Sequence, residues 1–166
     1  MRLTATTDYS MRLLMYLGSH PERLCTIAEI ARVHGISEPN LMKITHRLAR
    51  AGWIETIRGK NGGMRLARDP AEISLGAVVR DTENDLAIVA CMGAQNPACI
   101  LTGQCGLTGI MQGALDRFLA HLDSYTLADI LPAGQPYSSS QRTVTGCERN
   151  TEMTVSFTSP STSETT

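Results

Sequence analysis

Apolar residues recur at intervals of three and four over the first fifty positions, and this spacing is typical of amphipathic helices. A first helix is predicted from Thr7 to Gly18, where a glycine ends the pattern. A second helix is predicted to begin after a cap at Thr26 and to stop at Gly35. The apolar positions are Tyr9, Leu13, Tyr16 and Leu17 in the first helix and Ile27, Ile30 and Ala31 in the second.

A third helix is predicted from a cap at Ser37 to Gly52, with Pro39 in its first turn. Two helices joined through a glycine turn, the second capped by serine, are typical of the helix-turn-helix motif, so the third is the expected recognition helix. Asparagine can read adenine edges, and lysine or arginine can read guanine or hold phosphate. A merely solvated helix face is the alternative. From this helix we expect DNA contacts by Ser37, Glu38, Asn40, Lys43 and Arg47.

Two alternating segments, residues 53–58 and 64–68, flank a basic, glycine-rich stretch, which predicts a small β-hairpin, the wing of a winged helix. A glycine-rich loop could instead hold nucleotide phosphates. This chain lacks the Walker spacing and the strand-to-helix junction that such a site needs. A wing that touches the DNA backbone or minor groove accounts better for the basic residues. Outside the recognition helix, we expect DNA contacts by Arg2, Arg58, Lys60, Asn61 and Gly62.

A single apolar stripe continues for more than four turns after residue 106, behind a short predicted helix at Leu75–Arg80 and an acidic segment at 81–85. The stripe consists of Leu107, Ile110, Met111, Ala114, Leu115, Phe118, Leu119 and Leu122. Packing within its own domain is one option, but so small a core favours burial against a second copy. Helix-turn-helix proteins commonly read two half-sites, so we expect a homodimer on double-stranded operator DNA.

Composition and charge indicate the class of binding partner and the cellular location. Residues 1–70 carry eleven Lys or Arg against six Asp or Glu, whereas residues 71–166 carry four against ten, so the amino-terminal half is expected to meet a polyanion. The sequence shows neither a membrane span nor a signal peptide, so a cytoplasmic protein is expected. The Ser- and Thr-rich segment 133–166 is expected to be a disordered tail.

Three cysteines, Cys91, Cys99 and Cys105, lie within fifteen residues on a predicted loop. Thiolates favour zinc, copper(I) or iron-sulfur clusters, and such sites need four ligands, so one ligand is missing locally. Ordinary buried thiols are the alternative. The remaining cysteines, Cys25 and Cys147, are assigned to packing and to the tail, not to the cluster.

Several motifs together resemble the nitric-oxide-sensitive NsrR repressors, in the family of dimeric winged-helix regulators that also holds IscR and RirA. The motifs are residues 1–4, 7–9, 58–63, 81–83 and 122–129 with the three cysteines, and the resemblance covers residues 1 to 132. Two features depart from this resemblance. The interval between Cys91 and Cys99 is longer than in some close relatives, and the tail has no counterpart in the family.

The resemblance implies an iron-sulfur cluster held by the three cysteines and by Asp8 of the other protomer, with [4Fe-4S] favoured over [2Fe-2S]. Arg12, one turn from Asp8, could orient that carboxylate. A helix cap is the alternative role of Asp8. The histidine-ligated member of the family is a weaker match, because no histidine lies between Cys105 and His121.

The implied function is a transcriptional repressor, not an enzyme, in which nitric oxide attacks the cluster, abolishes DNA binding and derepresses nitric oxide detoxification genes. A sensor of iron or cluster supply is the alternative within the family. An electron carrier would not need the helix-turn-helix. A structural zinc site is the remaining alternative, which colour would separate from iron. The expected divisions are a DNA-binding domain (1–80), a cluster-binding loop (81–106), a dimerisation helix with a short following helix (107–132) and the tail (133–166).

Overall fold

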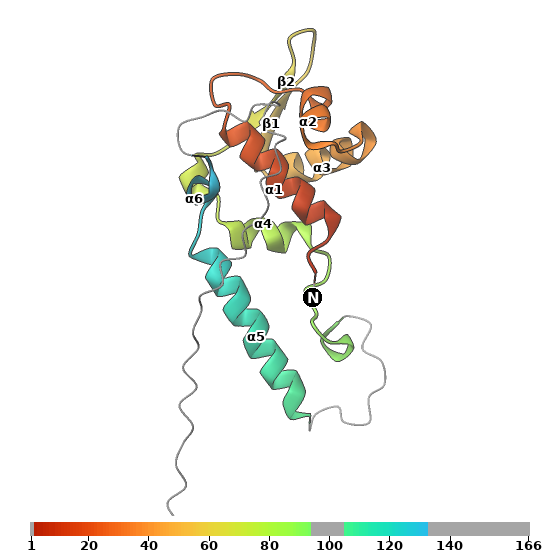
Figure 1. The fold of residues 1–166 in the computed structure, drawn as a ribbon, viewed down its shortest axis with the longest axis vertical. Coiled ribbons are helices and arrows are strands. Elements are labelled where there is room, and N and C mark those ends of the chain that lie inside the picture. The colour runs from red at the N-terminus through yellow and green to blue at the C-terminus, as the bar shows by residue number, and fades with distance from the viewer. Residues whose placement is uncertain (1, 94–104, 133–166) are drawn as a thin grey trace, which may run out of the picture.

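The computed structural model describes residues 2–93 and 105–132, and it confirms a mainly α winged helix-turn-helix fold (Figure 1). The predicted tail lies outside the described residues. The order and bounds are α1 (Ala5–Gly18), α2 (Ile27–His34), α3 (Glu38–Arg50), β1 (Ile54–Ile57), β2 (Gly63–Leu66), η1 (Pro70–Glu72), α4 (Leu75–Thr82), η2 (Ala90–Met92), α5 (Gly106–Asp123) and α6 (Leu127–Ile130).

The first helix begins earlier than its apolar pattern indicated, because the cap lies upstream. Thr4 is the N-cap of α1, and its side chain accepts from the backbone N–H of Thr7. Asp8 therefore lies inside the helix and does not cap it, which excludes the alternative role considered above. In α2, Thr26 and Glu29 form the reciprocal capping box, and Gly35 ends the helix with a left-handed φ of 66°.

The recognition helix α3 has the expected position, with two local differences. Ser37 occupies the N-cap, as predicted, but its side chain does not make the expected capping hydrogen bond. The helix ends at Arg50 rather than at Gly52, whose φ of 76° turns the chain toward the wing. Leu41, Ile44, Thr45 and Leu48 are the residues that α3 buries.

The wing is a two-stranded antiparallel hairpin in which Ile54 pairs with Leu66 and Ile57 with Gly63. Cys25 extends it by a single bridge, because its backbone exchanges two hydrogen bonds with Met64, of 3.0 and 2.8 Å. The Cys25 thiol is completely buried, and burial raises its pKa. This cysteine therefore serves packing, as predicted.

One core joins these elements, and the C-terminal part of the described chain returns to it. Leu127 of α6 is fully buried, and its backbone N–H donates to the carbonyl of Ile73 at 2.8 Å. The central buried residues are Leu13, Leu14, Leu17, Ile30, Leu41, Leu48, Trp53, Met64, Ile73 and Val78.

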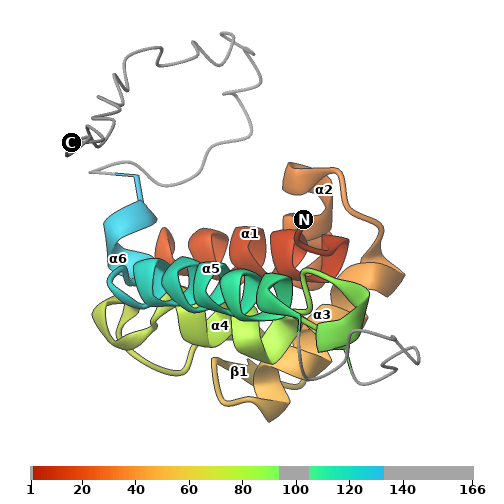
Figure 2. The same ribbon diagram turned by 90° about the horizontal axis from the view of Figure 1, so that it is seen from below.

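The long helix α5 runs away from the winged helix and contacts α4 along one end (Figures 1 and 2). Of its apolar stripe, only Leu115 is buried, whereas Leu107 is 51% exposed and Ile110 is 70% exposed. Within residues 2–93 and 105–132, no helix combines the length and apolarity needed to span a bilayer.

Candidate DNA interface and cluster site

The predicted DNA-contacting residues of α3 lie on its surface. Ser37, Glu38, Asn40 and Lys43 are exposed, and Arg47 is half-buried on the flank that faces α1. Asn40, Lys43 and Arg47 line one side of an open hollow of about 330 Å³, whose other side is the first turns of α1. Two cations beside this hollow make it a suitable place for a polyanion.

The basic wing tip projects beyond β1 and β2 (Figure 1). Arg58, Lys60 and Asn61 are exposed there. Gly62 has a structural reason to be glycine, because a Cβ at this position would lie 2.3 Å from the carbonyl oxygen of Ile57. The predicted contact by Gly62 can therefore come only from its backbone.

The N-terminal segment adds a further cation to the same side of α1. Arg2 is exposed and lines a hollow of about 570 Å³ with Asp8 and Arg12. It also lies beside residues 83 and 85–88, on the way to the cysteine loop. Arg2 is thus positioned between the predicted DNA interface and the predicted cluster loop.

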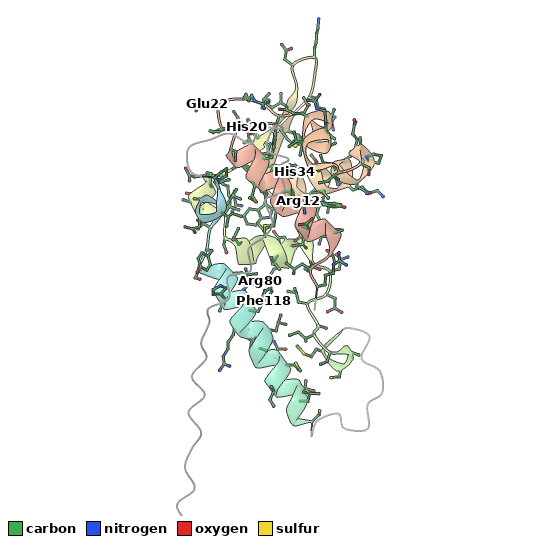
Figure 3. All side chains as sticks on the ribbon, in the orientation of Figure 1. Arg12, His20, Glu22, His34, Arg80 and Phe118 are labelled. Carbon is green, nitrogen blue, oxygen red and sulfur yellow. The ribbon has the colours of Figure 1, made fainter. Side chains whose placement is uncertain are left out.

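Asp8 and Arg12 form the ion pair that their spacing indicated, with Arg12 Nε 3.0 Å from Asp8 Oδ2. Both side chains are 48% exposed, so the carboxylate remains accessible to another molecule. His34 of α2 lies near this pair (Figure 3). Burial lowers the pKa of His34, the charge of Arg12 lowers it further, and Asp8 opposes both effects.

Two of the three predicted cysteine ligands lie beside Thr108, in the first turn of α5. Cys91 Sγ lies 3.5 Å from Thr108 Oγ1. Cys105 is the N-cap of α5, although its side chain makes no capping hydrogen bond. The nearby backbone N–H groups of Thr108 and Leu107 and the Thr108 hydroxyl lower the pKa of its thiol. These donors favour the thiolate, the form that binds soft metals.

The third predicted ligand, Cys99, lies outside the described residues. Among residues 2–93 and 105–132, no three His, Cys, Asp or Glu side chains converge in a way that could hold a metal ion. Among the described residues of one chain, Cys91, Cys105 and Asp8 therefore do not form a complete ligand set.

The end of α4 and the acidic residues that follow it anchor the winged helix, which the sequence did not reveal. Asp81 accepts from the indole Nε1 of Trp53 at 2.7 Å, and Arg47 Nη2 donates to Asn84 Oδ1 at 3.2 Å. Glu83 is buried and accepts hydrogen bonds from the backbone N–H of Thr4 and from the hydroxyls of Thr4 and Thr7. The end of α4 is thus tied to the base of the wing, and the segment that leads from it to Cys91 is tied to α1 and to α3.

Comparisons of sequence place this architecture among known regulators. The HTH-type transcriptional regulator NsrR of Geobacillus kaustophilus is 50% identical over 132 residues, which cover 79% of this chain and 90% of that protein. The Bacillus subtilis regulator of the same name is 46% identical over the same shares.

Solved structures agree on the fold. T. potens IscR has a TM-score of 0.63 and 26% identity, covering 78% of this chain and 85% of that one. CymR, the global cysteine regulator of B. subtilis, has a TM-score of 0.64 at 24% identity, covering 78% and 95%. The Rrf2 profile, described as an iron-dependent transcriptional regulator, matches residues 3–133. The chain therefore belongs to the Rrf2 family of transcriptional regulators.

Proposed function

We propose that this protein is a homodimeric, DNA-binding transcriptional repressor whose iron-sulfur cluster senses nitric oxide. The observation that carries the cluster assignment is that Cys91 and Cys105 both lie beside Thr108 in the first turn of α5, where neighbouring polar groups lower the pKa of the Cys105 thiol. The similarity to regulators named NsrR supports nitric oxide as the signal.

Cys91, Cys99 and Cys105 of one protomer, with Asp8 of the other, are the proposed ligands, and a [4Fe-4S] cluster is favoured over [2Fe-2S]. Thiolates suit iron, and the exposed carboxylate of Asp8 would be a weaker oxygen ligand to it. When bound, the cluster supplies iron atoms with which nitric oxide reacts. Arg12 holds the Asp8 carboxylate in orientation through their ion pair.

Repression requires both recognition helices to fit successive major-groove half-sites. A tie between Asp8 of one protomer and the cysteine loop of its partner would restrict how the two α3 helices are oriented. Release of that tie would allow a second dimer geometry, in which the half-site spacing is lost. Nitric oxide detoxification genes are the proposed targets.

Iron supply is the second candidate signal, because the matching family is described as an iron-dependent transcriptional regulator. The same residues would then hold a cluster whose loss in low iron, rather than its reaction with nitric oxide, changes DNA binding. The two signals are separable because one is a reactive gas and the other is the removal of metal.

The deciding experiment follows absorbance and DNA binding together, anaerobically, on one purified sample. The DNA probe is a duplex that the wild-type protein selects from a random-sequence library. Nitric oxide is titrated into one series and an iron chelator into another, for wild type, Asp8→Ala and the control Asp116→Ala. Asp116 is an exposed carboxylate of α5 that accepts from Gln112.

We expect a brown protein that loses its chromophore and its DNA affinity at a few nitric oxide molecules per cluster, while the chelator acts slowly. Asp8→Ala should bind the cluster less stably, and Asp116→Ala should behave as wild type. If the chelator acts first and nitric oxide has no effect, iron supply replaces nitric oxide. A colourless protein contradicts the cluster itself.

A further inference from the structure

Arg47 of the recognition helix is held by a residue from outside the helix-turn-helix. Its Nη2 donates to Oδ1 of Asn84 at 3.2 Å, across 37 positions of sequence. Asn84 follows the end of α4 and lies seven positions before Cys91. The segment that leads to the cysteine loop therefore fixes one side chain at the edge of α3.

Asn84 is a neutral residue between two acidic ones, Glu83 and Asp85. A carboxylate at this position would neutralise Arg47, whereas an amide oxygen accepts the hydrogen bond and leaves the full charge of the guanidinium. The neighbouring carboxylates are engaged elsewhere, since Glu83 accepts from the start of α1 and Asp85 from the backbone N–H of Ala87. Arg47 is thus oriented without being compensated by this segment.

The position of Arg47 suits a phosphate contact. It lines the hollow between α3 and α1 together with Lys43 and Tyr9, on the flank of the recognition helix. Phosphate contacts fix the register of a protein on DNA, whereas base contacts come from the groove-facing surface of the helix. An uncompensated cation at this flank contributes to affinity through counterion release.

We propose that Asn84 is a positioning residue that directs Arg47 toward a DNA phosphate while preserving its charge. This role presupposes the DNA binding proposed above and adds to it a contact from the segment that precedes Cys91. Asn84 itself touches no DNA in this arrangement, so its substitution acts through Arg47.

The test compares two substitutions that affect position and charge differently. Affinity for the selected duplex is measured by fluorescence anisotropy over a range of salt concentrations. For Asn84→Asp we expect about three- to tenfold weaker binding at low salt, and a salt slope lowered by about one for each protomer, because Arg47 becomes ion-paired. For Asn84→Ala we expect a loss of less than about threefold with the slope unchanged, because the charge of Arg47 remains.

Two controls separate this effect from a general change of charge. Gln112→Glu makes the same amide-to-carboxylate change on α5, away from α3, and should leave affinity and slope as in wild type. In an Arg47→Ala background, Asn84→Asp should have no further effect, since the residue through which it acts is gone. Thermal unfolding midpoints establish that each variant is folded.

The proposal is overturned if Asn84→Asp keeps wild-type affinity and slope, or if it weakens binding equally in the Arg47→Ala background. An equal loss from Gln112→Glu also overturns it. If the wild-type protein selects no duplex, the proposed DNA-binding function fails as well. If the wild type binds and Asn84→Asp changes nothing, only the positioning role fails.

Discussion

Arg80 of α4 and Asp123 of α5 form a two-point ion pair, with Nη1 2.7 Å from Oδ1 and Nη2 2.6 Å from Oδ2. The pair lowers the pKa of Asp123 through hydrogen bonds from Arg80. Next to it, α4 approaches the end of α5 at Gly76, where a Cβ would meet Asp123 Oδ1 at 2.1 Å. The end of α5 is therefore held close against α4 at this junction.

Gly76→Ala is expected to destabilise the fold by about 1–3 kcal/mol, because the new methyl group forces α4 and α5 apart. Alanine would otherwise favour the helix, so a loss of stability is diagnostic of the close approach. Urea unfolding measures the change. Combining it with Asp123→Ala removes the carboxylate that the methyl group would strike, and the double variant should lose less than the sum of the two single variants.

Ile110→Glu is expected to convert a dimer into a monomer, because this 70% exposed side chain belongs to the apolar stripe proposed as the dimer interface. Its effect on the folding of one chain should be small, within about 0.5 kcal/mol, since the site is on the surface. Light scattering across a concentration series gives the mass. Gln112→Glu, on the same helix but outside the stripe, should leave the dimer intact. A dimer that persists in Ile110→Glu would contradict this interface.

Lys60→Ala in the wing is expected to weaken DNA binding similarly for all sequences and to lower the salt slope by about one for each protomer. Arg65→Ala provides the comparison on β2. The guanidinium of Arg65 is already paired with Glu55 at 2.9 Å, so its removal should change the slope less. Anisotropy titrations at several salt concentrations measure both. Equal slopes for Lys60→Ala and wild type would remove the wing tip from the interface.

Acid is expected to weaken the link between α1 and α2. Arg23, together with the Tyr16 hydroxyl that donates at 2.7 Å, lowers the pKa of Glu29 from 4.5 to about 2. A carboxyl group whose pKa is depressed by folding stabilises the native state above its unfolded pKa, and that stabilisation is lost as the pH falls from 4.5 toward 2.

After allowance for solvent screening, the contribution is about 1–2 kcal/mol. Glu29→Gln should therefore be less stable than wild type at pH 7 and nearly equal to it at the acidic end. Denaturant unfolding at a series of pH values measures the difference. A gap between the two proteins that stays constant with pH would assign the stabilisation to packing rather than to charge.

The helices and the wing were predictable because local sequence patterns specify them. Contacts between residues far apart in the chain were not predictable. Apolar spacing located α2 and α3 to within two residues, because each helix buries a regular face. The start of α1 was missed because its cap, Thr4, precedes the apolar pattern. The hydrogen bonds from Thr4 to Glu83 and from Arg47 to Asn84 join positions 79 and 37 residues apart, and no sequence periodicity indicates such a contact.

The residue types proposed for the candidate site could be identified from the sequence, but the way in which the fold brings them together could not. Cysteine spacing indicated a soft-metal site, and the ion pair of Asp8 with Arg12 followed from helical spacing. The convergence of Cys91 and Cys105 on Thr108 depends on how η2 is placed against the start of α5, which sequence spacing does not determine. The cluster ligands and the DNA contacts remain predictions.

The placement of Trp53 gives the protein an optical reporter without any label. It is the single tryptophan of the chain, it is 6% exposed, and its indole N–H is bonded to Asp81 beneath the cation of Arg68. An indole in such a site emits at shorter wavelength than one in water. Any event that withdraws the end of α4 from the base of the wing would shift this emission to the red, so one fluorescence spectrum could follow the winged helix in real time.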